Sequence, residues 1–389
     1  MILSLYIVFW LSIGAIFHSY VFFPLLVKFL ARNKSLSFPE LNDKDLPKLS
    51  ILVSAFNEEE VIAEKIESIY QNNYPQNRFQ LLIGSDHSTD KTNEIIQSYA
   101  DKYPNLIFKA YPKRRGKQNV INDLVQLSNG SILILTDANV IFDTDTLREI
   151  ARPFADKKIG LVDTNMINKG LKIEGISHQE KAYISREVYV KHAESVVWGS
   201  MMGPFGGCYA IRREDYTPVP ANALVDDFYI NMKIFEKGKK AINNLHAKVF
   251  EDVSNNLKDE LVRKIRIATG NFQNLKAFAH LLWPLNSGIS FCFLSHKVLR
   301  WLGPFFILLA FISSLLLIEI PFYRLMVVVQ IVGFISPLID SLLRKLNIHL
   351  RILRFVTHFY SMNLALFIGF FRFTKGVKSG VWKVTKRNQ

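Results

Sequence analysis

The sequence predicts an α/β domain with a parallel sheet, flanked at both ends by membrane-embedded segments. From residue 49 onward, short apolar runs alternate with helical stretches, which is typical of strand–helix–strand crossover units. The first 27 residues are apolar apart from a few Ser and Tyr residues and one His, and the chain beyond residue 287 is mostly apolar again. With 389 residues and 49% hydrophobic content, the chain can form one sizeable soluble core and several membrane segments.

Residues 1–30 are predicted to be an uncleaved membrane anchor. The alternative, a cleaved signal peptide, would begin with basic residues and carry an apolar run of about 7 to 15 residues before a small-residue cleavage site. This segment begins without charge, is long enough to span a bilayer, and has its basic residues, Lys28, Arg32 and Lys34, at and beyond its far end. The positive-inside tendency then places the following domain in the cytoplasm.

Residues 31–48 are polar and contain proline, which indicates a linker. The α/β domain is expected to occupy residues 49–279. Its first predicted strands are 49–56, 79–85, 106–111 and 131–136, and its first predicted helices are 58–72 and 90–102. In such an open sheet, ligands bind at the carboxyl ends of the strands.

Residues 280–389 are expected to form a C-terminal membrane region with a basic tail. Its candidate spans are 302–318, 325–343 and 355–371. Three spans after a cytoplasmic domain would leave the basic tail on the far side, against the positive-inside tendency. One segment is therefore predicted to be re-entrant or interfacial. The first candidate is 355–371, which contains His358 and Asn363, and a surface helix at 281–299 is the second.

Positive charge is concentrated in this C-terminal region. The chain has 48 Lys and Arg against 34 Asp and Glu, and residues 281–389 hold 13 of these basic residues against Glu319 and Asp340. This distribution indicates contact with membrane lipids rather than with nucleic acid. The only two cysteines, Cys208 and Cys292, predict neither a disulfide framework nor a thiolate metal site, so a reducing cytosol is expected around the soluble part.

The most informative motif is Asp137-Ala138-Asn139, which directly follows the predicted strand 131–136. It is a D-x-D motif in which an amide replaces the second carboxylate. A carboxylate at the carboxyl end of a parallel strand can hold a divalent cation against a diphosphate. Asp137 and Asn139 are therefore the predicted ligands of Mg²⁺ or Mn²⁺.

Two further loops follow predicted strands and precede helices. Asn57 and Glu58 end the first strand, where capping of the next helix by Asn57 explains them equally well. In the loop 84–90, small residues let a base or ribose approach the backbone, and Asp86 can accept from a pyrimidine N–H or a ribose hydroxyl. An ordinary helix cap at 88–90 is the alternative there.

A third loop, 113–117 (K-R-R-G-K), precedes a predicted helix at 118–127. Basic side chains and free amides at the start of a helix attract phosphate. The alternative is that these basic side chains are only a solvated run of charge on the surface. The position of the loop between Asp86 and Asp137 favours a nucleotide.

In their order and spacing, segments 55–59, 85–90, 115–117 and 136–139 resemble the family 2 glycosyltransferases with a GT-A fold. The membrane-bound branch of that family includes cellulose, chitin and hyaluronan synthases. The resemblance continues through the glycine loop and strand at 206–213 and through Val225-Asp226-Asp227-Phe228, which is similar to the family's T-E-D base motif. It covers about residues 49–275. It implies a nucleotide-diphospho-sugar transferase domain with a Rossmann-like mixed sheet.

The resemblance implies donor-side roles. Asp86 would contact the uracil of a UDP-sugar, and Asp137 would bind the metal and the donor diphosphate. The other implied nucleotide-sugar-binding residues are Ala55, Asn57, Glu58, Arg115, Lys117 and Arg266.

The acceptor side is implied in the same way. Asp227, next to Asp226, would be the catalytic base, because a sugar hydroxyl is a poor nucleophile and needs a carboxylate to take its proton. Gly206 and Gly207 would line the acceptor site together with Asp227. The alternative is that both aspartates form the acidic start of a helix at 228–237.

The sequence departs from the family at two places. Asn139 offers a neutral oxygen where the family has a carboxylate, so weaker metal binding is expected. At 263–267, where processive members have Q-x-x-R-W, Arg266 keeps the charge that could meet the diphosphate, but Arg263 and Ile267 replace Gln and Trp. In processive synthases that Trp helps to form the acceptor platform, so its absence argues against long-chain polymerisation. The basic face of an amphipathic helix near anionic lipid is the alternative for this segment. Residues 382–387 resemble a tail element of the membrane-bound branch.

The sequence therefore predicts a multi-pass cell-membrane glycosyltransferase whose catalytic domain is cytoplasmic. It would be an inverting enzyme, which moves a sugar from a UDP-sugar to a polysaccharide or lipid acceptor and forms a β-glycosidic bond. The alternative is a catalytically inactive, nucleotide-sugar-binding membrane scaffold of a polysaccharide assembly complex, in which Asn139 marks lost metal binding. A decayed site would also lose Asp86, Asp227 or the glycine loop, and all three remain. Donor sugar, acceptor identity and oligomeric state do not follow from the residues.

Overall fold

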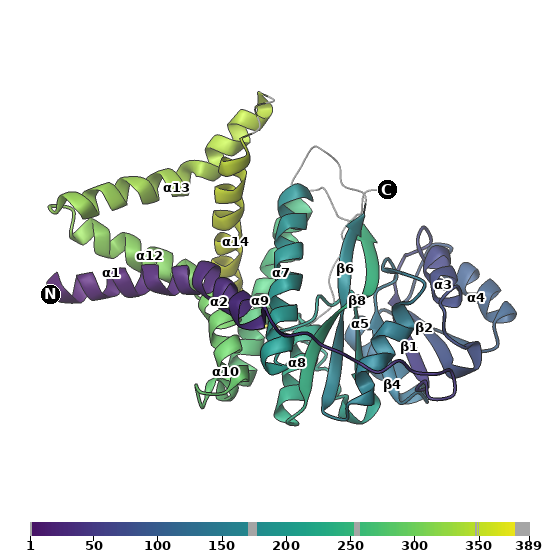
Figure 1. Cartoon of the computed structure of the whole chain (residues 1–389). Helices are drawn as coiled ribbons and strands as arrows, with labels where there is room; N and C mark the ends of the chain where they lie inside the picture. Colours follow the sequence, from purple (N-terminus) through teal and green to yellow (C-terminus); the bar gives the residue numbers. More distant parts are fainter. Residues whose placement is uncertain (1, 170–176, 253–256, 347, 349, 378–389) are drawn as a thin grey trace. The chain divides into compact units, whose positions relative to one another are not determined.

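In the computed structural model, the described residues are 2–169, 177–252, 257–346, 348 and 350–377. The chain divides into two compact units, each described here by itself. Of the described residues, 30–169, 183–252 and 377 belong to the α/β unit, and 2–29, 177–182, 257–346, 348 and 350–376 belong to the helical unit. Figure 1 shows the elements of both units coloured along the chain.

The α/β unit is built on a sheet whose described strands follow the order β3-β2-β1-β4-β7-β6-β8-β5. Its first half is parallel and consists of β3 (Leu106–Ala110), β2 (Phe79–Ser85), β1 (Leu49–Ala55) and β4 (Ile132–Thr136). These strands agree with the predicted ones to within one residue at each end. They are apolar almost throughout because β1, β2 and β4 are buried on both faces.

The second half of the sheet mixes directions. β7 (Cys208–Arg212) is antiparallel to both β4 and β6 (Ile159–Lys169), and β8 (Lys240–Asp252) is parallel to β6. The short strand β5 (Ile141–Phe142) pairs antiparallel with β8. The sheet is therefore mixed, which confirms the predicted α/β class with its Rossmann-like mixed sheet.

Helices pack on both faces of the parallel half. On one face, Ile51 and Val53 of β1 join Ile62 and Ile66 of α3 (Ile62–Tyr70) in the main hydrophobic cluster. On the other face, Gly84 of β2 lies against Val120 and Leu124 of α5 (Lys117–Leu127). Successive side chains of a strand point to opposite faces, which lets helices pack on both sides. Because β1, β2 and β4 run parallel, their carboxyl ends lie at one edge of the unit. Further α-helices described in this unit are α4 (Thr92–Lys102), α6 (Thr146–Ala151) and α8 (Asp226–Glu236), together with the part of α7 (Ser177–Trp198) from residue 183 onward.

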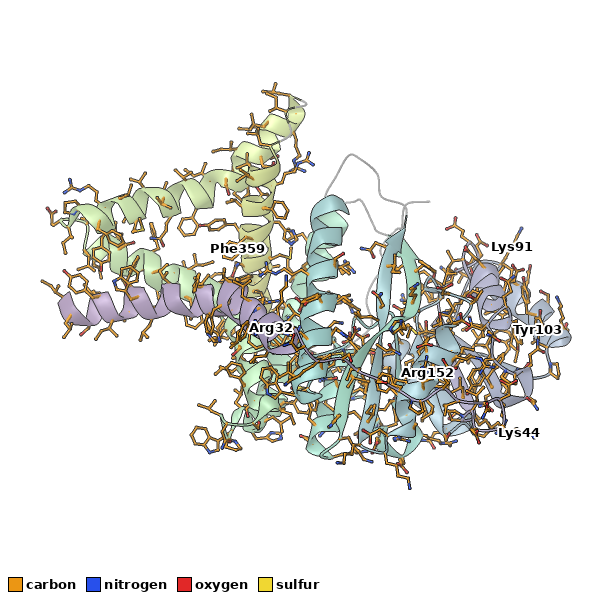
Figure 2. All side chains as sticks on the ribbon, in the orientation of Figure 1. Arg32, Lys44, Lys91, Tyr103, Arg152 and Phe359 are labelled. Carbon is orange, nitrogen blue, oxygen red and sulfur yellow. The ribbon has the colours of Figure 1, made fainter. Side chains whose placement is uncertain are left out.

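The polar segment 32–48 runs along the α/β unit without a helix or strand. Its backbone carbonyls accept from arginines of the domain: Arg152 donates to Pro39 O at 3.2 Å, and Arg78 donates to Lys44 O at 3.1 Å. Figure 2 labels Lys44 and Arg152 on this unit. The arginines thus satisfy backbone groups of a segment that has no ladder of its own.

The helical unit contains three described helices that are long and apolar enough to cross a membrane, Ile2–Ala31, Pro321–Lys345 and Ile352–Thr374. The first joins α1 (Ile2–Phe17) and α2 (Phe23–Ala31) through a π-helical turn, and the other two lie within α13 (Pro321–Lys345) and α14 (Arg351–Thr374). Phe9 of α1 packs with Ala310, Leu317 and Tyr323 in a small apolar cluster. The apolar helices support a membrane-bound protein, as predicted.

The structure does not interrupt the segment that was the first candidate for a re-entrant or interfacial helix. Residues 355–371 lie within the uninterrupted helix α14. Instead, residues 288–301 and α12 (Gly303–Leu316) form a pair of helices that bend by 61° at Leu302. This pair is either one broken span or a re-entrant hairpin.

Helix α9 (Leu257–Phe278) belongs to the helical unit and packs against α14. A Cβ atom at Gly369 would lie 2.6 Å from the Ala268 Cβ, and the Phe272 and Phe370 rings meet edge to face with centroids 5.2 Å apart. This contact needs a glycine because the helix backbones approach so closely. The predicted end of the soluble domain near residue 279 stays a prediction.

Candidate active site

Asp137 stands at the carboxyl end of β4, where sequence placed it. Its N–H donates to Gly207 O at 2.9 Å, which ties the end of β4 to the glycine loop before β7. Its carboxylate accepts from Lys117 Nζ at 2.6 Å. Burial opposes the charge of Lys117, but the attraction of Asp137 and Asp226 outweighs burial and raises the pKa of Lys117 above its usual range. The ammonium group of Lys117 therefore already forms an ion pair with the Asp137 carboxylate.

Lys65 of α3 supports this loop from beneath. It is completely buried and donates to Thr136 Oγ1 at 2.9 Å and to Val140 O at 2.5 Å, on the two sides of the D-x-N triplet. Its ammonium also lies 3.7 Å from the centroid of the Phe142 ring. Burial lowers the pKa of Lys65 to about 7, against the attraction of Asp137. No sequence pattern predicts this role, since a lysine on an amphipathic helix is ordinarily exposed.

The surroundings of Asn139 include a carboxylate that the sequence did not predict. Its Nδ2 donates to Glu251 Oε1 at 3.1 Å, and its Oδ1 is buried with no hydrogen-bond partner in the described part of the chain. Glu251 lies near the carboxyl end of β8, so the structure brings a carboxylate next to the amide that replaced one. Sequence reasoning missed Glu251 because no local motif marks it.

Asp86 organises the basic loop. It is 3% exposed, and its two carboxylate oxygens accept from the N–H groups of Arg115 at 2.6 Å and Gly116 at 2.8 Å. The guanidinium of Arg114 lies 3.7 Å from the centroid of the Phe56 ring. Loops that follow β1 and β2 thus meet the loop before α5 at one place. The contact of Asp86 with uracil stays a prediction.

The loops after β1 and β2 are also joined to each other. Asn57 Oδ1 accepts from the Thr89 N–H at 2.9 Å, and the Glu58 N–H donates to Thr92 Oγ1 at 2.8 Å. Asn57 has a φ of +52°, which is uncommon for a residue other than glycine and indicates local strain held by its surroundings. Helix α3 begins at Ile62, so Asn57 bridges two loops and does not cap that helix.

Asp226 and Asp227 begin α8. Gly206 has a φ of +80°, and a Cβ at this position would lie 2.5 Å from Asp227 Oδ2, so the glycine lets the carboxylate rest on the loop backbone. Burial, followed by the neighbouring charge of Asp226, raises the pKa of Asp227 to about 7. The Phe228 N–H, Lys117 and Lys191 act in the opposite direction. A carboxyl with such a pKa is suited to exchange a proton near neutral pH.

The structure thus gathers most of the predicted residues at one edge of the α/β unit. Lys117 links the two sides, because it pairs with Asp137 and also feels the charges of Asp226 and Asp227. Ala55 accepts from the Asp86 N–H at 2.8 Å. Arg266 lies on α9 in the other unit, so its contact with the diphosphate stays a prediction. The tail motif 382–387 lies outside the described residues.

The residues fit a cation shared with a substrate better than a preformed metal cage. Within the described ranges, no group of three or more His, Cys, Asp and Glu side chains could hold a metal ion. Asp137, the partnerless Oδ1 of Asn139 and the adjacent Glu251 supply oxygen atoms of the kind that Mg²⁺ and Mn²⁺ prefer. Mg²⁺ is usually held by one or two carboxylates together with substrate phosphates.

Comparison with known proteins defines the class. A solved structure, the mannosyltransferase PcManGT from Pyrobaculum calidifontis in complex with GDP-Man and Mn²⁺, superimposes with a TM-score of 0.70 at 20% identity. The match covers 96% of this chain and 99% of that one. The fold is therefore that of the GT-A nucleotide-sugar transferases. Residues 50–217 match the model of glycosyl transferase family 2.

Two of the curated relatives carry the names of enzymes that act on a glycolipid or on a dolichyl phosphate sugar. A β-monoglucosyldiacylglycerol synthase from a Nostoc species is 28% identical over 156 residues, which are 40% of this chain and 33% of that protein. A dolichyl N-acetyl-α-D-glucosaminyl phosphate 3-β-D-2,3-diacetamido-2,3-dideoxy-β-D-glucuronosyltransferase from Methanococcus voltae is 23% identical over 259 residues, covering 64% of this chain and 80% of that protein. The match thus spans only about a third of the Nostoc enzyme.

Proposed function

We propose that this protein is an inverting glycosyltransferase that moves a sugar from a UDP-sugar to a hydroxyl of a lipid-linked or polysaccharide acceptor at a membrane. The observation that carries the proposal is the Asp227 carboxyl. It rests against Gly206, has a pKa raised toward neutrality, and is coupled through Lys117 to the strand-end Asp137. A base and a diphosphate-binding edge therefore lie in one site.

Asp227 is assigned the role of general base. The acceptor hydroxyl gives its proton to Asp227 as its oxygen bonds to the anomeric carbon of the donor. The bond between that carbon and the diphosphate oxygen breaks, and the electron pair leaves with UDP. Displacement from the opposite face inverts the anomeric carbon and gives a β-glycosidic bond.

The leaving diphosphate needs positive charge. Lys117 and the N–H groups at the start of α5 supply it, because basic side chains and free amides at a helix N-terminus bind phosphate. Asp137, Asn139 and Glu251 would hold a divalent cation, which when bound supplies further charge to the diphosphate. Mn²⁺ accompanies GDP-Man in the structurally similar mannosyltransferase.

UDP is proposed as the nucleotide because of the surroundings of Asp86. Both of its oxygens already accept backbone N–H groups, and each carboxylate oxygen can accept a second hydrogen bond. A pyrimidine N–H is a donor of the right kind. The GDP-Man bound to the similar mannosyltransferase makes GDP-mannose the natural competitor in a donor test.

The membrane is the proposed place of the acceptor. Three described helices are apolar and long enough to span it, and the relatives named above act on lipid or dolichyl phosphate acceptors by their names. We place the protein in the cell membrane with its catalytic domain in the cytoplasm. A catalytically inactive scaffold is disfavoured because Asp86, Asp137, Gly206 and Asp227 keep a connected arrangement.

The experiment is a donor panel on membranes that contain the full chain. Radiolabelled UDP-glucose, UDP-galactose, UDP-N-acetylglucosamine and GDP-mannose are incubated with and without Mn²⁺ or Mg²⁺, and products are extracted and sized. Cation-dependent product from a UDP-sugar is expected. Transfer from GDP-mannose alone would overturn the UDP assignment, and no product from any donor would favour the scaffold. A long ladder of products identifies a polymerase, and one added sugar on lipid identifies a single transfer.

A further inference from the structure

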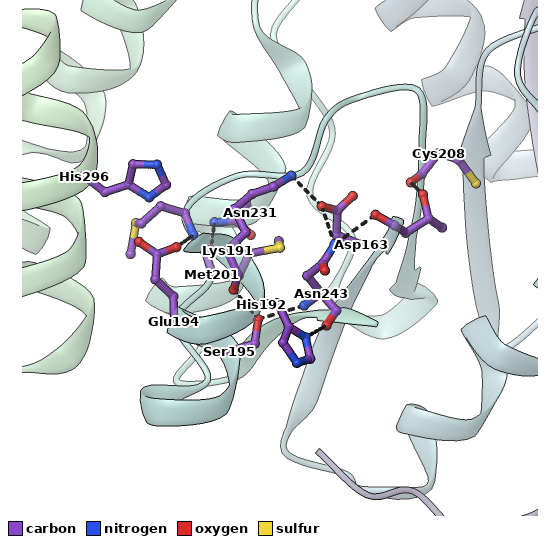
Figure 3. Close-up of polar contacts among 12 residues, drawn as sticks. Asp163, Lys191, His192, Glu194, Ser195, Met201, Cys208, Asn231, Asn243 and His296 are labelled. Carbon is purple, nitrogen blue, oxygen red and sulfur yellow. Dashed lines mark hydrogen bonds and ion pairs between the residues drawn. The ribbon is translucent and has the colours of Figure 1, made fainter. Parts of the chain in front are cut away.

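A buried ion pair lies behind the acceptor loop. Lys191 of α7 is 1% exposed, and its Nζ lies 2.6 Å from Oδ2 of Asp163 on β6, which is completely buried. Asn243 on β8 donates to the same oxygen at 3.2 Å. Figure 3 shows Lys191, Asp163 and Asn243 converging from the helix and the two strands. No residue of this group was a predicted site residue.

Stability alone is a poor explanation for such a pair. Removing two charges from water costs free energy that their attraction often fails to recover, so well-packed apolar residues usually serve stability as well or better. Retaining the pair is therefore more readily explained by a positional or electrostatic role.

The pair is connected to the loop that carries Gly206. The Lys191 ammonium lies 3.4 Å from the centroid of the Phe205 ring, directly before Gly206 in the chain. One turn further along α7, Glu194 Oε2 accepts from the Met202 N–H at 3.0 Å. Helix α7 thus holds the loop 202–207 at two points. Because Asp227 rests on Gly206, the position of this loop determines the position of the base.

The charge of Lys191 also reaches Asp227. The ionisable groups that face Asp227 are Asp226 on its own helix, Lys117 on α5, Lys191 on α7 and the phenol of Tyr209 on β7. Asp226 raises the pKa of Asp227, and the two lysines lower it. Lys117 pairs with Asp137, whereas Lys191 pairs with Asp163 and lies against Phe205, next to Gly206.

We propose that Lys191, held by Asp163, is a positioning residue for the base: together they fix the glycine loop on which Asp227 rests and place a positive charge behind that loop. This inference rests on the proposed function, in which Asp227 removes the acceptor proton. It assigns the pair a role in the reaction in addition to packing.

The test is the pH dependence of transfer by a variant that removes both charges, Lys191→Met with Asp163→Asn. Removing both avoids leaving an unpaired buried charge. Transfer from the most active donor of the panel is followed between about pH 5.5 and 9. Lys191, unlike Asp163, is among the charges that act on Asp227, so its loss should move the acid limb of kcat/KM upward, by up to about one pH unit.

The matched control removes the exposed pair Lys233 and Glu236, which lies on the same helix as Asp227, by Lys233→Met with Glu236→Gln. The acid limb of its kcat/KM profile should lie at the same pH as that of the wild type. Lys191→Arg, which keeps the charge, should also keep the wild-type limb even if kcat falls.

An acid limb that stays in place in the double variant while the rate falls evenly at all pH values would overturn the inference. So would a shifted limb in Lys191→Arg, which also decides the matter if the double variant does not fold. Failure of the proposed function is recognised separately, because the wild type would then give no product or Asp227→Asn would keep its activity.

Discussion

Asp227 sets the pH range in which the proposed reaction can proceed. A general base works only when it is deprotonated, and the pKa of this carboxyl is raised to about 7 by burial and by Asp226. We expect kcat/KM of the wild type to rise about tenfold per pH unit below that value and to level off above it. Steady-state transfer rates between about pH 5 and 9 measure this. A rate that falls as pH rises through 7 would contradict the assignment.

Glu251 is the residue that best accounts for the missing carboxylate of the D-x-N triplet. It accepts from Asn139 at 3.1 Å, so it either binds the cation or orients the amide that does. We expect Glu251→Gln to raise the Mn²⁺ concentration needed for half-maximal UDP binding by about tenfold or more, as losses of outer-shell partners do. Calorimetric titration of Mn²⁺ in the presence of UDP measures the change.

The control for this variant is Glu214→Gln, which removes an exposed carboxylate from the same unit. It should leave the Mn²⁺ requirement unchanged. An unchanged requirement in Glu251→Gln as well would place the cation on Asp137 and the substrate alone.

The residue pairs that sequence reasoning missed share one property. Asn139 and Glu251 are 112 positions apart, and Lys191 and Asp163 are 28 apart, so each pair exists only after the sheet has formed. By contrast, Asp86, Asp137 and Asp227 lie beside strand or helix ends that short-range pattern reveals. Their roles as contacts to uracil, metal and acceptor remain predictions.

At the scale of elements, the strands were more predictable than the helix starts. β1, β2 and β4 are nearly continuous apolar runs, and their bounds agree with prediction to within one residue because burial on both faces requires this pattern. Helix α3 starts four residues later than predicted, since Asn57 bridges two loops. The sequence predicted a span from residue 302 and a surface helix before it, and the structure places a bend of 61° at this boundary, where residues 288–301 carry Lys297 and Arg300 and residues 303–316 carry no charge.

The packing of α9 on α14 gives a prediction at this scale. A Cβ at Gly369 would overlap Ala268, so Gly369→Leu should force the helices apart and destabilise the protein by about 1 to 3 kcal/mol or more. Thermal unfolding in detergent measures the loss. Gly14→Leu is the control, because a Cβ there meets nothing within 4 Å. Equal melting temperatures for both variants would contradict close packing of α9 on α14.

At the scale of the molecule, the bent pair bears on membrane topology. Two uninterrupted C-terminal spans return the chain to the side on which it started, so a re-entrant pair would place Lys375 on the same side as the catalytic domain, in agreement with the positive-inside tendency. We expect Lys375→Cys and Lys44→Cys, both at exposed positions, to react with an impermeant maleimide from the same side of sealed vesicles. The two native cysteines are buried. Labelling from opposite sides would show that the pair crosses.

The most direct measurement of the central claim separates transfer from nucleotide binding in Asp227→Asn. The amide keeps the shape of the side chain but cannot take a proton, so transfer should fall by about 100-fold or more while UDP binds with nearly wild-type affinity. Both quantities are measured on the purified full chain, by product formation and by calorimetry. Normal turnover in this variant would contradict the claim that Asp227 is the base of a glycosyltransferase.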